Sequence, residues 1–320
     1  MRRVLAAALV GIAAMAGAQE IRLLPIDREE HVALDRALDR LVQGRSTGDR
    51  ATRWQAHFLK GADGRTYVPF TVTLDGRGER FAEAAVSFRV AVREIMNTRF
   101  GTAAFRFVQR NAFGVRMQPT PTGGRFVRSA LMLRPGPYEV FVALRERSGT
   151  ARPETAALTA SIAVPDFTKK GLLLSSVIVA DRLEPAGEGA ETGAAWPYVL
   201  GASQIVPAAD TEFTRDEALT VAFQVYNAAT FVDGKPDVQV DYRVYREGTN
   251  EPVGATAPQT FDVDSLPEEF SAAAGHQLTP VQGLPLAQFE PGKYRLHIEV
   301  RDFLGDARAT VVVPFTIMGV

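Results

Sequence analysis

The 320-residue sequence contains no cysteine. This absence excludes disulfide bonds, a thiol nucleophile and a thiolate metal site, and it also excludes a lipid-modified N-terminal cysteine. A charge excess is absent too, because 36 basic residues balance 37 acidic ones for a net charge of −1. We therefore expect no nucleic-acid partner, since binding a polyphosphate backbone needs a surplus of basic side chains.

Residues typical of catalytic sites are also scarce. The four histidines are His31, His57, His276 and His297, and no two of them have the spacing that brings two imidazoles to one metal ion on a helix or a strand. The sequence has no Gly-x-Ser-x-Gly nucleophile motif and no Gly-Lys-Ser/Thr phosphate loop. We expect no cofactor and no enzymatic activity. A hydrolase whose site is assembled from distant segments is an alternative.

Long apolar runs are confined to the N-terminus. Arg2 and Arg3 precede an apolar run from Val4 to about Ala16, and Ala16-Gly17-Ala18 has the form of a signal-peptidase site. Residues 1–18 are therefore predicted to be a cleaved signal peptide, whereas a membrane anchor is disfavoured because the run falls short of the roughly 20 residues of a spanning helix.

Cleavage would leave 34 basic and 37 acidic residues, a net charge of −3. We expect an exported, periplasmic or extracellular protein with no lipid anchor and no membrane span. Export without disulfides indicates a bacterial protein.

A short helix is predicted within the lead segment 19–50. Asp27 and Glu30 form a possible N-terminal cap, and apolar residues then follow at helical spacing up to Gly44. The apolar stripe consists of Val32, Leu34, Leu38, Leu41 and Val42. We expect this helix to pack on the first domain, and a mobile lead segment is the alternative.

The rest of the sequence is organised around one β element that occurs twice. A Pro-Gly turn (Pro135-Gly136, then Pro291-Gly292) is followed two residues later by a tyrosine, Tyr138 or Tyr294, that begins an alternating strand. Each tyrosine is predicted to form a tyrosine corner, in which a buried ring keeps its hydroxyl bonded to nearby backbone.

Other segments repeat in the same order. Phe70-Thr-Val72 aligns with Phe223-Gln-Val225, Phe88-Arg-Val90 with Tyr242-Arg-Val244, and Val164-Pro165 with Val313-Pro314. About seven short alternating segments in each half predict two tandem immunoglobulin-like β-sandwich domains, residues 51–168 and 169–320, in an all-β fold. An up-and-down barrel is the alternative.

Three segments outside the repeat have distinct expected structures. The apolar run Leu172–Val179 is expected to be one strand buried on both faces. Residues 100–118 are aromatic-rich and are expected to alternate less regularly than the other segments, and residues 184–195 are expected to form a flexible acidic loop.

Several of these motifs also carry a family resemblance. The run Pro135–Arg145, then Val164-Pro-Asp-Phe167 and Leu172–Val179, resembles the C-terminal region of exported acidobacterial proteins related to von Willebrand factor A. Residues 198–315 are similar to the next segment of those proteins. The resemblance covers roughly residues 66–318 and implies the fold and export. The Asp-x-Ser-x-Ser metal loop of the A domain is absent.

Two groups of residues are candidate binding sites. The acidic set Asp262, Asp264, Glu268 and Glu269 could supply oxygen ligands to a cation, although a solvated acidic loop is the favoured interpretation.

The aromatic residues Phe141, Tyr226 and Tyr245 lie at strand positions opposite to the apolar face. They could form a binding patch or stack on sugar rings, or they could belong to a domain interface or to the covered second face of a sheet. The sequence thus predicts a non-enzymatic binding or scaffolding protein, with another envelope or extracellular protein as its partner. A carbohydrate-binding protein with a glycan partner is the alternative.

Overall fold

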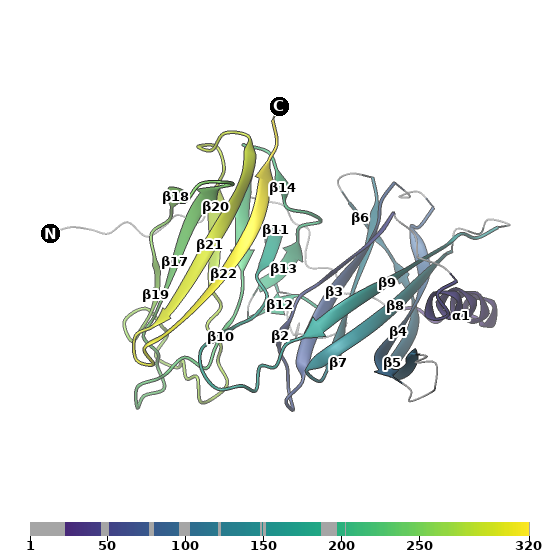
Figure 1. Cartoon of the computed structure of the whole chain (residues 1–320), viewed down its shortest axis with the longest axis horizontal. Coiled ribbons are helices and arrows are strands. Elements are labelled where there is room, and N and C mark those ends of the chain that lie inside the picture. Colours follow the sequence, from purple (N-terminus) through teal and green to yellow (C-terminus); the bar gives the residue numbers. More distant parts are fainter. Residues whose placement is uncertain are drawn as a thin grey trace.

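The computed structural model describes residues 23–45, 51–76, 80–95, 103–120, 123–147, 149, 152–186, 197–201 and 203–319. These residues form two β-rich units and one helix, which lies at the side of domain 1 away from domain 2 (Figure 1). The predicted signal peptide and most of the predicted loop 184–195 lie outside the described residues.

Domain 1 is a two-layer sandwich. One layer, named here seam sheet 1, has the order β1-β3-β7-β6, with β2 also paired to β3, and the other, outer sheet 1, has the order β5-β4-β8-β9. Phe70 on β3 meets Phe88 on β4 edge to face at 5.8 Å between ring centroids, in the core between the layers. The strands are β1 (Thr52–Ala56), β2 (Leu59–Lys60), β3 (Thr66–Leu74), β4 (Glu83–Ile95), β5 (Ala103–Arg116), β6 (Gln118–Pro119), β7 (Arg125–Leu133), β8 (Gly136–Glu146) and β9 (Thr155–Val164).

Domain 2 repeats this two-layer plan. Seam sheet 2 has the order β12-β13-β11-β15-β20, and outer sheet 2 the order β14-β22-β21-β17-β18, with β19 also paired to β17. A short ladder of β10 with β16 lies beside them. The strands are β10 (Leu173–Leu174), β11 (Ile178–Pro185), β12 (Val199–Leu200), β13 (Ser203–Pro207), β14 (Glu212–Phe213), β15 (Ala218–Ala222), β16 (Val225–Tyr226), β17 (Val238–Arg246), β18 (Pro252–Ala255), β19 (Gln259–Phe261), β20 (Val281–Pro285), β21 (Gly292–Asp302) and β22 (Ala307–Ile317).

The fold class predicted from the sequence is confirmed, since the chain is mostly β with separate facing sheets. Strand pairing also tests the predicted repeat. Phe88 pairs with Val142 and Tyr242 with Ile298, so each occupies the same position relative to its corner tyrosine. That part of the alignment is confirmed.

One part of the alignment is wrong by four residues. Tyr138 pairs with Ile162, whereas Tyr294 pairs with Phe315. The structural counterpart of Val164 is therefore Ile317 rather than Val313. The shared Val-Pro dipeptide was misleading because β9 ends before Pro165, whereas β22 continues past Pro314 to Ile317.

The two corners have the same geometry. The Tyr138 hydroxyl donates to the Arg134 carbonyl at 3.0 Å, and the Tyr294 hydroxyl donates to the Glu290 carbonyl at 2.6 Å, four residues upstream in both cases. Gly136 and Gly292 have φ of +143° and +154°, a conformation that a side chain disfavours. This requirement explains why glycine precedes the tyrosine-led strand in both domains.

Helix α1 (Arg28–Val42) begins with the predicted capping box, in which Asp27 and Glu30 each accept the other's backbone N–H. Leu34, Leu38 and Leu41 are buried on outer sheet 1, while Val32 is exposed. The helix thus packs on domain 1 and covers the outward face of this sheet.

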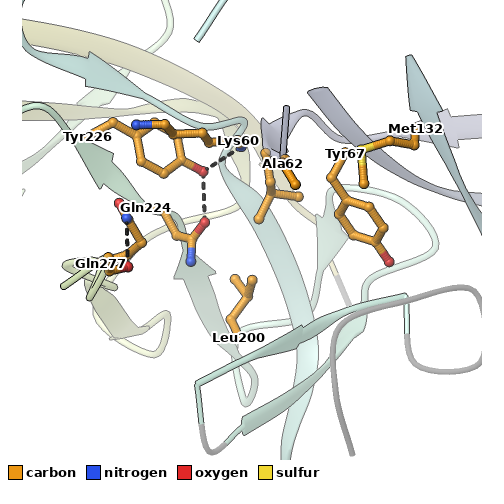
Figure 2. A pocket seen from close by; sticks show the side chains of 11 residues that line it. Lys60, Ala62, Tyr67, Met132, Leu200, Gln224, Tyr226 and Gln277 are labelled. Carbon is orange, nitrogen blue, oxygen red and sulfur yellow. Dashed lines mark hydrogen bonds between the residues drawn. The ribbon is translucent and has the colours of Figure 1, made fainter. Parts of the chain in front are cut away.

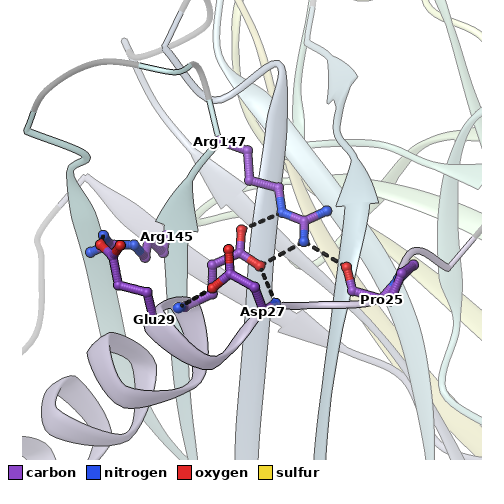
Figure 3. A network of polar contacts seen from close by, with 6 residues as sticks. Pro25, Asp27, Glu29, Arg145 and Arg147 are labelled. Carbon is purple, nitrogen blue, oxygen red and sulfur yellow. Dashed lines mark hydrogen bonds and ion pairs between the residues drawn. The ribbon is translucent and has the colours of Figure 1, made fainter.

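Ion pairs fix the helix in register with the sheet (Figure 3). Arg147 donates to both carboxylate oxygens of Glu30 at 2.6 and 2.7 Å and to the Pro25 carbonyl at 2.6 Å. A Cβ at Gly114 would lie 2.2 Å from the Arg147 guanidinium, so only glycine lets this side chain cross the β5 strand. Farther along the helix, Arg89 bridges Asp35 and Asp39, and Arg145 contacts Glu29.

One strand prediction was wrong, and one strand was not predicted. Leu172–Val179 is not one strand, because β10 ends at Leu174 and β11 begins at Ile178. Between these two strands the Ser175 N–H donates to the Gln224 carbonyl, and the Gln224 N–H donates to the Ser175 hydroxyl. The segment expected to alternate less regularly contains the 14-residue strand β5, which pairs along the whole of β4.

Candidate functional site

The outward faces of the two seam sheets pack on each other, and this contact is called the seam. Every residue of β3 is buried, since Val68, Phe70 and Val72 face the domain 1 core and Tyr67 faces domain 2. The apolar contact consists of Leu59, Tyr67, Ile178, Ala180, Tyr198, Leu200, Ile205 and Ala222, with Ala130 and Val281 packed against it. The domains therefore share a core of their own.

Hydrogen bonds among backbone groups and side-chain hydroxyls join the domains at one edge of the seam. The Ser176 N–H donates to the Phe58 carbonyl at 2.9 Å, and the Phe58 N–H donates to the Ser176 hydroxyl at 2.9 Å. The Lys60 N–H donates to the Tyr226 hydroxyl at 2.9 Å, and that hydroxyl donates to Gln224 Oε1 at 2.7 Å. Burial raises the pKa of the Tyr226 phenol, so the hydroxyl keeps its proton for this relay.

The linker between the domains, residues 165–172 between β9 and β10, packs against the same tyrosine. Phe167 is buried and meets the Tyr226 ring edge to face at 5.2 Å. Asn227, in the left-handed region at φ +58°, donates its side-chain amide to the carbonyls of Lys169 and Gly171. The relative placement of the domains is thus held by both ring packing and hydrogen bonds.

Two titratable groups are buried near the centre of the seam. His57 Nδ1 lies 3.1 Å from the Tyr198 hydroxyl, and burial lowers the pKa of the His57 imidazole to about 4. Burial lowers the pKa of Arg128 to about 10, and its guanidinium lies over the Phe126 ring at 4.4 Å from the centroid. Both groups belong to domain 1 and are shielded from water by the seam, so their environment depends on the two domains remaining in contact.

A pocket of about 390 Å³ opens at the edge of the seam beside Tyr226 (Figure 2). Its apolar wall includes the Tyr67 ring, Met132 and Leu200, and its polar end carries the amides of Gln224 and Gln277. The full lining is Leu59, Lys60, Gly61, Ala62, Tyr67, Met132, Leu200, Gln224, Tyr226, Gly275 and Gln277. Domain 1 supplies the first six of these residues and domain 2 the last five.

The lining favours binding of a neutral group. Gln224 accepts from Tyr226 through Oε1, and Figure 2 shows its amide nitrogen directed away from that tyrosine. Lys60 supplies the one formal charge among the described lining residues, and its Nζ lies 3.4 Å from Asn227 Oδ1 and 5.8 Å from the Tyr226 ring centroid. Apolar side chains with two amides at one end suit an apolar group attached to a peptide-like backbone.

The three candidate aromatic residues do not gather into one exposed binding patch. Phe141 is buried beneath α1, between Phe105 and Phe107 at centroid distances of 5.2 and 6.4 Å. Tyr226 is buried in the seam and reaches the pocket only as part of its wall. The alternative stated for these residues therefore holds for two of them, because a helix covers the face that carries Phe141 and domain 1 covers the face that carries Tyr226.

Tyr245 differs from the other two aromatic residues. It is half-buried on outer sheet 2 and lies against the His297 ring at 4.4 Å between centroids. The three predicted aromatic residues thus lie on three separate surfaces and cannot line one sugar-binding face.

The acidic set does not converge on a cation position. Asp262 Oδ1 accepts the N–H groups of Asp264 and Ser265 at 3.0 and 2.9 Å, and hydrogen bonds from Ser265 lower the pKa of the Asp262 carboxyl. Glu268 and Glu269 are exposed in the same loop. No group of three or more potential metal ligands occurs in the part of the chain that the structure describes.

The sequence carries no local signal for the pocket. Gln224 lies between the buried residues Phe223 and Val225, where an alternating segment places an outward polar residue, so it is inconspicuous in the sequence. Lys60, Met132 and Gln277 carry no local signal, because their proximity depends on the packing of two domains.

Comparison with known proteins shows a likeness among solved structures but none among protein families or curated proteins. The crystal structure of Salmonella α2-macroglobulin reacted with methylamine matches 84% of this chain at 14% identity, with a TM-score of 0.22. The match spans 17% of that protein's chain, so the likeness concerns a small part of a much longer protein. Within the described residues, no helix has the length and apolarity needed to cross a membrane.

Proposed function

We propose that this chain is an exported, non-enzymatic binding protein that holds a partner polypeptide at the seam pocket. The observation that supports this most directly is the pocket itself, built by two domains that a shared core keeps in fixed orientation. A fixed orientation lowers the entropy lost on binding because the site need not be ordered by the ligand.

The pocket lining indicates how the partner binds. An apolar side chain of the partner would enter between Tyr67, Met132 and Leu200, and its backbone would receive a hydrogen bond from the Gln224 amide nitrogen. Gln277 Nε2 donates one hydrogen to the Gly275 carbonyl at 3.0 Å and would offer its second hydrogen to the partner. The expected partner is another protein of the bacterial envelope or the extracellular space. Support for export comes from the apolar, arginine-led N-terminal sequence and from the resemblance to exported acidobacterial proteins.

Export is tested by expressing the full chain and a chain that lacks residues 2–18 in a bacterial host. The full chain is expected in the exported fraction with a mature N-terminus at Gln19, whereas the shortened chain should remain inside the cell. Retention of both chains in the cytoplasm would contradict export without affecting the pocket.

Partner binding is tested by site-specific photocrosslinking in native envelope. A photoreactive phenylalanine at Ala62, on the exposed pocket rim, is expected to give a discrete protein adduct, and the same group at exposed Val253 on β18 is the control. Met132→Trp should abolish the Ala62 adduct by filling the pocket. The same adducts from both positions, or adducts insensitive to Met132→Trp, would show that the pocket is not the binding site.

A further inference from the structure

Three loops of domain 2 meet at the end of the sandwich opposite the C-terminus, below β17 and the β21–β22 hairpin (Figure 1). They are residues 227–237, 262–276 and 302–306. Lys235 lies at their centre and is buried, with Nζ at 3.4 Å from the Val263 carbonyl and 3.5 Å from the Leu266 carbonyl. This lysine therefore ties the first loop to the second.

Further hydrogen bonds tie the third loop to the first. The buried Asp302 carboxylate accepts the N–H groups of Ala229 and Gly305 at 2.8 and 2.9 Å. The Phe303 N–H donates to the Asp237 carbonyl at 2.9 Å. The three loops thus form one structured surface, and a ligand would find it already ordered.

This surface carries an unusual number of exposed apolar side chains. Of the thirteen exposed large apolar residues in the described chain, five belong to these loops: Phe231, Val232, Val263, Phe303 and Leu304. Loop tips that expose aromatic and branched side chains together are unfavourable in water, and such patches mark interaction sites. We call these five residues, with the loops that carry them, the apolar tip.

Acidic side chains surround the apolar tip. The three loops contain eight carboxylates against one lysine, the buried Lys235: Asp233, Asp237, Asp262, Asp264, Glu268, Glu269, Asp302 and Asp306. The adjoining strand residues Arg301 and Arg308 pair with each other in the β21–β22 register, and Arg301 contacts Glu299 on its own strand. The local charge is therefore negative around the exposed apolar groups.

We propose that the apolar tip is a docking surface for a cationic, apolar-rich polypeptide segment. Phe231, Val232 and Phe303 would bury against apolar side chains of the partner, while Asp264, Glu268 and Glu269 would face its arginine or lysine residues. Anionic lipid is disfavoured because the same carboxylates would repel its headgroups. Gly275, in the second loop, also lines the seam pocket, but none of the five apolar residues of the tip does. Binding at the tip and binding at the pocket can therefore be tested with separate variants.

Selection from a random 12-residue phage-displayed peptide library on the immobilised mature protein tests this surface. Enriched peptides are expected to combine net positive charge with aromatic or aliphatic residues. For a synthetic peptide of the enriched sequence, the double variant Val232→Ser/Phe303→Ser should raise Kd at least about tenfold. The triple variant Asp264→Asn/Glu268→Gln/Glu269→Gln should also raise Kd and flatten its dependence on salt.

The matched control is Val253→Ser/Glu251→Gln, which removes an exposed valine and a carboxylate at β18. It should leave Kd within about twofold, as should Met132→Trp at the seam pocket. No enrichment, enrichment of uncharged or acidic peptides, or equal losses in the control would overturn the proposal. Binding of phosphatidylglycerol vesicles that the tip variants abolish would overturn it in favour of a membrane surface.

Discussion

Acidification should weaken folding through one buried histidine, His57. Its imidazole lies in the seam against the Tyr198 hydroxyl, and burial lowers its pKa to about 4 from the 6.5 of an accessible histidine. The folded state therefore holds the ring neutral at a pH where the unfolded chain already binds a proton. Stability must fall as pH falls through this interval, because protons bind preferentially to the unfolded state.

The size of the effect follows from the difference between the two pKa values. Each unit corresponds to about 1.4 kcal/mol, so the full difference is roughly 3 kcal/mol, complete below about pH 4. Relative to pH 8, the free energy of unfolding should be lower by roughly 2 kcal/mol at pH 5. Desolvation and Arg295 also lower the pKa of His297, so this histidine reduces stability at low pH in the same direction. A His297 variant is therefore the control.

Urea unfolding at pH 8, 7, 6 and 5 measures this dependence, with tryptophan fluorescence as the signal because Trp54 packs against the domain 1 core. His57→Gln should remove most of the slope between pH 6.5 and 5, whereas His297→Gln should leave most of it. An NMR titration should show the His57 ring neutral at pH 5 in the native protein. A wild-type slope near zero, or a slope that survives His57→Gln, would refute the assignment.

Three further predictions concern the packing of domain 1 and the two corners. Leu38→Ala, at a fully buried position of α1, should lower the free energy of unfolding by about 3 kcal/mol in urea titrations. Tyr138→Phe and Tyr294→Phe should each cost about 1 kcal/mol, with the larger loss at the more buried Tyr294; equal stability of both variants and wild type would contradict the corner assignment. Arg147→Ala should cost about 1–3 kcal/mol and raise the pKa of Glu30, which NMR titration of that carboxyl can follow.

The architecture was predictable wherever a residue's role depends on its near neighbours. The Pro-Gly turn, the following tyrosine and its bond to a carbonyl four residues upstream form a local unit, so Tyr138 and Tyr294 could be paired from sequence alone. The cap of α1 was equally local, since Asp27 and Glu30 satisfy each other's N–H groups.

Predictions failed or stayed open wherever the outcome depended on what lies across a sheet face. For Phe141 an exposed patch and a covered face were both left open, because alternation identifies the two faces of a strand but not what covers each. Strand β5 was missed because a bulge at Val108 switches its faces. Phe105 and Phe107 therefore face α1, whereas Phe113 and Val115 face the domain 1 core.

The difference between inward and outward strand positions also explains why the seam pocket could not be predicted from the sequence. Phe141 and His297 occupy the same position, three residues beyond their corner tyrosines, yet one lies under a helix and the other beside Tyr245 on an uncovered sheet. Inward residues must fill the same two-layer core, so they keep the repeat visible in the sequence. The outward residues differ between the halves because a different element packs on each outward face. The seam pocket forms where the outward faces of the two seam sheets meet. Aligning the halves therefore identifies the framework, while the proposed binding surfaces lie at positions where the halves differ.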